Sequence, residues 1–162
     1  MVNNEAIVSI INKITTKNGP PCKKTLQKIV FLIEAKKVNL GCDYGIHFYG
    51  PYSSDLDFAV RELCGEGILN IEYTSLDHKI SVSDDSSLRP YDNPIVNTVI
   101  DEFAKDTPSE LELLATALYV YLNVKDINKI RSGVIKIKGN KYPDHRIASA
   151  ITRLQTQGYF TP

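Results

Sequence analysis

The stretch that most constrains the fold of this chain covers residues 44–69, which read YGIHFYGPYSSDLDFAVRELCGEGIL. Residues 46–49 are apolar and aromatic, which predicts a strand, and the Gly50–Pro51 pair after them predicts a turn that ends it. Ser54 with Asp57 three residues later is typical of a helix start, because such side-chain oxygens accept hydrogen bonds from the free amides of the first turn. A strand, a turn and a helix should therefore follow one another directly.

The helix that begins at this point also has a clear end. Gly65 and Gly67 predict its C-terminus, because glycine adopts the left-handed conformation of a helix cap without steric cost. The apolar side chains before them recur at helical spacing and should face the core. They are Leu56, Ala59, Val60 and Leu63.

The flanking segments complete a known order of elements. Residues 4–17 predict an amphipathic helix, and residues 23–38 predict a second helix that is apolar nearly all round and therefore buried. Residues 69–74 and 79–82 alternate around a loop at residues 75–77 and predict a hairpin. Helix, helix, strand, helix and hairpin is the layout of a winged helix, with the third helix presented and the hairpin as the wing.

The second half of the chain predicts helices. Asn93–Pro94 and Thr107–Pro108 are typical helix starts, residues 126–138 favour a helix over a strand, and residues 144–157 predict the last helix. We expect a mainly α protein with a small β wing (α+β), in which a winged-helix-like N-terminal unit is followed by a helical C-terminal half. The polar segment 84–91 would separate a unit of residues 1–85 from residues 92–162 packed against it, unless both form one single compact domain.

The last helix repeats the pattern of the central one. Seven apolar and glycine positions of residues 56–69 recur at identical offsets in residues 147–160. Internal duplication would produce this pattern, but so would two unrelated helices that end in glycine followed by apolar residues. Both explanations stay open.

These segments also carry a family resemblance. The motifs KKTLQKIVFLIEAKK and YGPYSS, the Leu-x-x-x-Gly-hydrophobic helix end, SELELLATALYVYL and KGNKYPDHRIASAITRLQTQGYF span nearly the whole chain. Through them the chain resembles the YwgA-like proteins of bacteria and archaea and, more distantly, the Panacea-domain (SocA-like antitoxin) proteins. The resemblance implies a winged-helix-like fold and, because some Panacea-type members neutralise toxins by binding them, a role in protein–protein interaction.

Apolar run length and cysteine content indicate where in the cell the protein resides. Uninterrupted apolar runs such as residues 29–33 are far shorter than a membrane span, and no basic leader precedes Glu5. The cysteines, at positions 22, 42 and 64, are odd in number and sparse, which favours reduced thiols over a disulfide framework. We therefore expect a cytoplasmic protein with no membrane partner.

The sequence shows none of the usual signals of catalysis. No nucleophile with a base, no carboxylate pair and no glycine-rich phosphate loop is recognisable, so we expect no enzyme, no cofactor and no small-molecule substrate. His47, His78 and His145 are scattered, and the cysteines lack the short paired spacings of zinc sites. We expect no metal site.

Charge distribution suggests two kinds of partner. Net charge is zero, but residues 1–40 and 125–162 are mainly basic and residues 41–124 mainly acidic, which indicates either solvated faces or surfaces directed at partners. An acidic helix and aromatic neighbours favour a protein partner over DNA, because phosphates repel carboxylates. The predicted partner-binding residues are Tyr52, Asp55, Asp57, Arg61 and Glu62.

The alternative is a DNA-binding transcriptional regulator. Winged helices suggest this role, but fold alone is an analogy, and the wing is acidic, with Asp84 and Asp85 at its end. The alternative therefore uses the basic C-terminal segment, which the lysines of the first two helices could extend. Its candidate residues are Lys136, Lys138, Lys141, Arg146 and Arg153.

Overall fold

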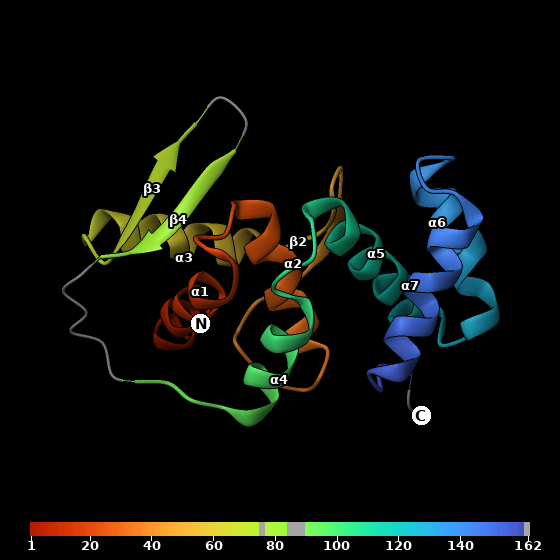
Figure 1. The fold of residues 1–162 in the computed structure, drawn as a ribbon, viewed down its shortest axis with the longest axis horizontal. Helices are drawn as coiled ribbons and strands as arrows, with labels where there is room; N and C mark the ends of the chain where they lie inside the picture. Colours follow the sequence, from red (N-terminus) through yellow and green to blue (C-terminus); the bar gives the residue numbers. More distant parts are fainter. Residues whose placement is uncertain (75–76, 84–89, 161–162) are drawn as a thin grey trace.

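The computed structural model describes residues 1–74, 77–83 and 90–160. Within these residues the protein is mainly helical and has two small antiparallel hairpins, which confirms the predicted class of a mainly α fold with a small β part. Figure 1 shows α1 and the β3–β4 hairpin toward one end of the long axis, α6 and α7 at the other, and α2 and α5 between them.

The first half contains α1 (Asn4–Asn18), α2 (Lys23–Glu34), β1 (Gly45–His47), β2 (Gly50–Tyr52), α3 (Ser54–Gly65), β3 (Leu69–Tyr73) and β4 (His78–Val82). Helix α2 is buried over nearly its whole length, as its apolar sequence predicts. It ends at Glu34, four residues earlier than expected, and the chain then turns through Lys37, whose φ of +66° is incompatible with a continuing right-handed helix.

The region before α3 differs from the sequence prediction. In place of one strand ended by a Gly50–Pro51 turn, β1 and β2 form a hairpin that pairs Gly45 with Tyr52 and His47 with Gly50. The turn lies at Phe48 and Tyr49, and the prediction was wrong because Pro51 is tolerated in a strand that belongs to a two-stranded ribbon. Helix α3 is capped one residue earlier than expected, by the Ser53 side chain, which accepts a hydrogen bond from Leu56 N at 3.2 Å.

The β3–β4 hairpin follows α3 as predicted. Its register runs from Leu69 opposite Val82 to Tyr73 opposite His78. The free edge of β4 reaches the start of α2, where Ile80 N donates to Pro21 O at 2.8 Å. The loop residues 75–76, and the segment 84–89 with Asp84 and Asp85, lie outside the described residues.

The second half contains α4 (Pro94–Phe103), α5 (Pro108–Val124), the 3-10 helix η1 (Ile127–Lys129), α6 (Ile130–Lys138) and α7 (Asp144–Thr156), which confirms the predicted helices. The expected capping box opens α5, with Glu110 N donating to Thr107 Oγ1 and Thr107 N donating to Glu110 Oε1, both at 3.1 Å. Helix α5 contacts α2, β2, α6 and α7 and so joins the two halves.

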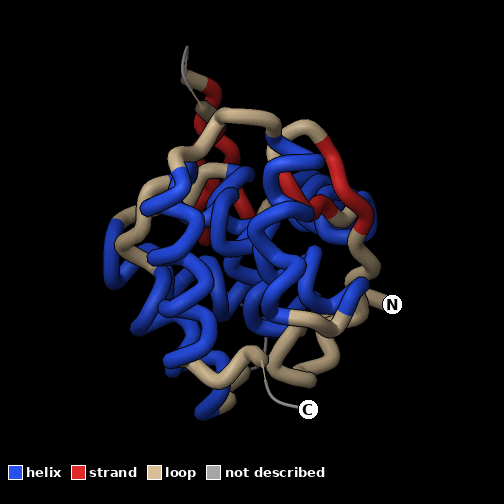
Figure 2. The backbone as a smooth tube through the Cα atoms, turned by 90° about the vertical axis from the view of Figure 1, so that its right-hand side faces the viewer, coloured by secondary structure: helices blue, strands red, loops and turns tan. Residues whose placement is uncertain are grey.

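Buried side chains of both halves form one continuous core. Helix α4 packs against α1 and α2, and α5 packs against α2. In Figure 2 the strands lie in the upper part of the view and helices fill the rest. The proposed division into residues 1–85 and 92–162 stays a prediction.

The repeated pattern of α3 and α7 corresponds to the same helix ending. Gly67 and Gly158 adopt φ values of +77° and +80°. Each is followed by an amide that donates to a carbonyl of the last helical turn, from Ile68 N to Leu63 O and from Tyr159 N to Leu154 O, both at 3.0 Å. The shared ending accounts for part of the likeness, and internal duplication stays a hypothesis.

Candidate functional site

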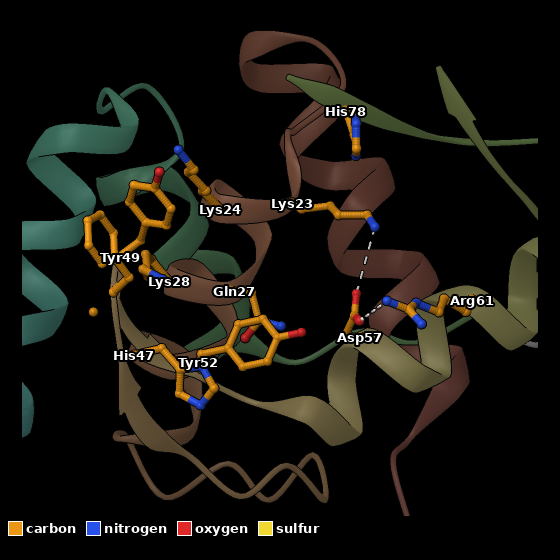
Figure 3. A pocket seen from close by; sticks show the side chains of 12 residues that line it. Lys23, Lys24, Gln27, Lys28, His47, Tyr49, Tyr52, Asp57, Arg61 and His78 are labelled. Carbon is orange, nitrogen blue, oxygen red and sulfur yellow. Dashed lines mark ion pairs between the residues drawn. The ribbon is translucent and has the colours of Figure 1, made fainter. Parts of the chain in front are cut away.

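A cavity of about 410 Å³ opens between α2, the β1–β2 hairpin, α3 and the first residue of β4. Figure 3 shows its lining side chains, which converge from these four elements. We call it the cationic cavity, because cationic side chains outnumber carboxylates in its lining. That lining comprises Lys23, Lys24, Gln27, Lys28, His47, Phe48, Tyr49, Gly50, Tyr52, Asp57, Arg61 and His78.

Helix α2 supplies the lysines on one wall. Lys24 and Lys28 are four residues apart and therefore lie on the same helix face. Lys28 is only 2% exposed, and its Nζ donates to Pro51 O at 3.0 Å. Burial lowers the pKa of Lys28 to about 8, against the opposing charge of Glu112, and the cations of Lys138 and Lys24 lower it further.

The same helix also holds α3 in place. Gln27 is buried, and its side chain bonds both backbone groups of Ser53: Ser53 N donates to Gln27 Oε1 at 2.8 Å, and Gln27 Nε2 donates to Ser53 O at 2.9 Å. Ser53 is the N-cap of α3. The start of α3 is therefore tied to α2 by two hydrogen bonds without exposure to water.

Asp57 organises the opposite wall. Its carboxylate lies 3.0 Å from Arg61 Nη2 and 3.8 Å from Lys23 Nζ, as the dashed lines of Figure 3 mark. Tyr52 lies beside it, and burial together with the Asp57 charge raises the pKa of the Tyr52 hydroxyl. The predicted capping box required Asp57 to cap the start of α3. Its carboxylate instead pairs with Arg61 and Lys23 and so links α3 to α2 across the cavity.

The turn between β1 and β2 forms the outer rim. We call Phe48 and Tyr49 the hairpin tip. Their side chains are 82% and 44% exposed, and their rings meet edge to face at 5.0 Å between centroids. The ammonium group of Lys24 lies 3.7 Å from the Tyr49 ring centroid, a cation–π contact.

Beneath the hairpin tip lies a buried ionic network centred on Glu112 of α5. Its Oε2 lies 3.3 Å from Lys138 Nζ and 2.7 Å from Lys141 Nζ, and it accepts a 2.5 Å hydrogen bond from the Tyr142 hydroxyl. Burial would raise the pKa of Glu112, but these bonds and the Lys138 charge outweigh it and lower the pKa. Lys138 also donates to Phe48 O at 2.7 Å, which fixes the hairpin tip to α6.

The structure separates the residues predicted to bind a protein partner. Tyr52, Asp57 and Arg61 line the cationic cavity. Asp55 and Glu62 instead lie along another side of α3, in a second hollow beside Met1 and Phe58. The five residues therefore do not form one patch.

The residues predicted for the nucleic-acid alternative are mostly engaged inside the protein. Lys138 and Lys141 bind Glu112, and Arg153 is paired with Glu102 and Asp106. Lys136 is exposed, and Arg146 lies over the Tyr142 ring at 5.3 Å. Intramolecular pairing thus neutralises three of the five cations.

The histidines and cysteines form no ligand set in the described part of the chain. Within it, no three His, Cys, Asp or Glu side chains gather closely enough to hold a metal ion. His47 stacks on Tyr52, with 4.7 Å between centroids, and His78 packs edge-on to Tyr73. The described helices include none that is long and apolar enough to cross a bilayer.

Sequence reasoning did not place the lysines of α2 at a cavity. It named them only as an addition to a DNA-binding surface, although Gln27 and Lys28 interrupt the apolar middle of α2. A polar pair at such positions is a signal that could have been used, because a buried cation needs a partner.

One known protein is similar to this chain over most of its length. The chain is 27% identical, over 145 residues, to the Uncharacterized protein YwgA of Bacillus subtilis (strain 168). The alignment covers 82% of this chain and 84% of that protein, which supports the YwgA-like resemblance. No family model matches the chain.

Proposed function

We propose that this chain is a non-enzymatic, winged-helix-like protein that binds another protein through the hairpin tip and the adjoining face of α3. The observation that carries the proposal is the exposure of three large apolar side chains on one short hairpin: Ile46 at 39%, Tyr49 at 44% and Phe48 at 82%. Covering such rings releases free energy, and clustered aromatic side chains are common anchors of protein interfaces.

The hairpin tip is also ordered in advance. Lys138 bonds the Phe48 carbonyl, Lys24 lies over the Tyr49 ring, and β2 packs against α2 and α5. Rings held in this way lose little conformational entropy on binding, which favours affinity.

The order of elements supports the winged-helix part of the proposal. After α1, the chain pairs with β4 at Cys22, enters α2 and α3, and then forms the β3–β4 hairpin. The likeness to Panacea-type proteins, some of which bind toxins, favours an antitoxin-like protein or a regulatory adaptor. Asp57 and Glu112, the carboxylates at the site, are both engaged by cations, which favours a binding role over acid–base catalysis.

The DNA-binding alternative has weaker support. Helix α3 carries Asp55 and Glu62 on one side and Asp57 beside Arg61 on another, and these carboxylates would repel the phosphates of a DNA groove. The basic C-terminal segment offers Lys136 and Arg146, since its other candidate cations are paired within the fold.

The proposal is tested by capture of a partner with tagged protein, followed by affinity measurement with the purified partner. Phe48→Ala should weaken binding by at least about 2 kcal/mol, roughly thirtyfold. Tyr73→Ala is the matched control, because Tyr73 is 70% exposed but lies on β3, and it should bind like the wild type. Equal effects of the two substitutions would contradict the proposed interface.

Two further measurements separate the alternatives. Reversal of Asp55, Asp57 and Glu62 to lysine should abolish capture if both sides of α3 contact the partner. Duplex DNA should bind weakly at physiological salt. A steep salt dependence that Arg146→Ala reduces by about one unit would favour the DNA-binding alternative instead.

A further inference from the structure

The cationic cavity holds more positive charge than its own lining neutralises. Lys23, Lys24, Lys28 and Arg61 line it, and Asp57 is the one carboxylate among the described lining residues. Arg61 and Lys23 already engage that carboxylate. Lys24 and Lys28 have no carboxylate within ion-pair distance in the described ranges 1–74, 77–83 and 90–160.

Lys28 is the least satisfied of these groups. It is 2% exposed, and its Nζ makes one hydrogen bond within the described residues, to Pro51 O. An ammonium group has three N–H donors, and a buried cation is costly unless an opposite charge and hydrogen bonds compensate it. An anion in the cavity would provide both.

The size and walls of the cavity narrow the class of ligand. A volume of about 410 Å³ exceeds what a simple ion requires and lies within the usual range of small-molecule sites, about 300–1,000 Å³. Aromatic side chains of the β1–β2 hairpin form a further wall: Tyr49 lies beside Lys24 and Lys28, and Tyr52 lies farther along the cavity (Figure 3). Such a wall accommodates the apolar faces of a ring.

We propose that the cationic cavity binds a small phosphorylated compound that carries a ring, with its phosphate at Lys24 and Lys28 and its ring against the aromatic wall. A phosphate monoester carries a charge of about −1.5 to −2, which matches two lysines without a carboxylate at ion-pair distance better than a single carboxylate does. Lysine binds phosphate as a point charge. The expectation of no small-molecule substrate rested on the absence of a nucleophile with a base, of a carboxylate pair and of a glycine-rich phosphate loop in the sequence.

The inference is independent of the proposed function, because ligand binding needs only the isolated protein. The test uses calorimetric titration with AMP, inorganic phosphate and adenosine. AMP should bind more tightly than inorganic phosphate, adenosine should bind most weakly, and added NaCl should weaken the AMP interaction. Adenosine binding as tightly as AMP, or no AMP binding at millimolar concentration, would overturn the inference.

Matched lysine variants locate the phosphate. Lys24 is exposed, so Lys24→Met should leave the fold intact and weaken AMP binding about tenfold through the loss of a charged hydrogen bond. Lys129→Met, an exposed lysine of η1 outside the cavity, should bind AMP like the wild type. Equal losses in both variants, or none in Lys24→Met, would refute the assignment of the site.

A direct reporter is available in Lys28. Nuclear magnetic resonance of its side chain should show the pKa, about 8 in the free protein, rising when AMP is added, because a nearby anion favours the ammonium form. An unchanged Lys28 pKa at saturating AMP would place the ligand elsewhere and contradict the inference.

Discussion

Replacing Glu112 by glutamine removes the negative charge at the centre of the buried network under the hairpin tip. Glu112 is 5% exposed, and the side chain of its partner Lys138 is 6% exposed, so the remaining cation would stay buried without a counter-charge. Removal of one partner from a buried ion pair costs about 3–5 kcal/mol. With a urea dependence of about 2 kcal/mol per M, the unfolding midpoint should fall by roughly 1.5–2.5 M.

The matched control is Asp101→Asn. Asp101 pairs with Lys17 at 2.8 Å, but both side chains are about half exposed, and such a pair contributes about 0–1 kcal/mol. Replacing Glu112 and Lys138 together by leucine and methionine should restore most of the stability, because apolar pairs often substitute for buried ion pairs. A loss below about 1 kcal/mol in Glu112→Gln would refute the reasoning, since the network would then be hydrated.

The same variant has a predictable pH dependence. Burial raises the pKa of Glu112, but the Lys141 and Tyr142 hydrogen bonds outweigh it, so the folded-state pKa lies below the ordinary value of 4.5. A depressed carboxyl pKa contributes stability that is fully present above the unfolded pKa and is lost as pH falls through the folded pKa. The stability gap between wild type and Glu112→Gln should therefore close below about pH 4.5 in acid titrations of unfolding free energy.

Glycine substitutions test two close contacts by denaturant unfolding. Gly50→Ala should destabilise more than Gly67→Ala: both glycines have positive φ, worth about 1–2 kcal/mol, but only the Gly50 Cβ would meet a neighbour, Thr116 Oγ1 at 3.0 Å. Equal losses of unfolding free energy in the two variants would mean that β2 can move away from Thr116 at little cost. Gly133→Ala should cost about 1–3 kcal/mol despite the better helix propensity of alanine, because its Cβ would lie 2.4 Å from Val120 Cγ1, and added Val120→Ala should recover part of the loss. An unchanged midpoint would contradict this packing of α5 on α6.

Local signals in the sequence were sufficient for most helices. Thr107 and Glu110 cap α5 as their spacing predicts, and Gly67 ends α3, because these preferences depend on neighbouring residues alone. The β1–β2 hairpin was mispredicted because Gly50 usually marks a turn, whereas here it stands close to Thr116 of α5, more than sixty residues away.

The candidate site was less accessible to sequence reasoning. Tyr52, Asp57 and Arg61 line one cavity, because Asp57 and Arg61 are four residues apart on α3 and Tyr52 lies just before that helix, while their predicted role in partner binding stays a prediction. Their proximity to Lys24 and Lys28 depends on how the start of α3 is held against α2 through the Gln27–Ser53 hydrogen bonds. Charge counts along the chain contain no information about that packing. The sequence analysis therefore assigned the basic C-terminal segment to an external partner, whereas carboxylates within the fold pair with several of its cations.

The backbone bond from Ile80 to Pro21 gives the β3–β4 hairpin a second attachment besides its connection to α3. Detachment of that edge would also move His78, at the mouth of the cationic cavity, away from the first turn of α2. We therefore expect local opening of the hairpin edge to carry His78 away from the cavity mouth. The exchange rate of the Ile80 amide hydrogen with solvent would report how often this edge opens.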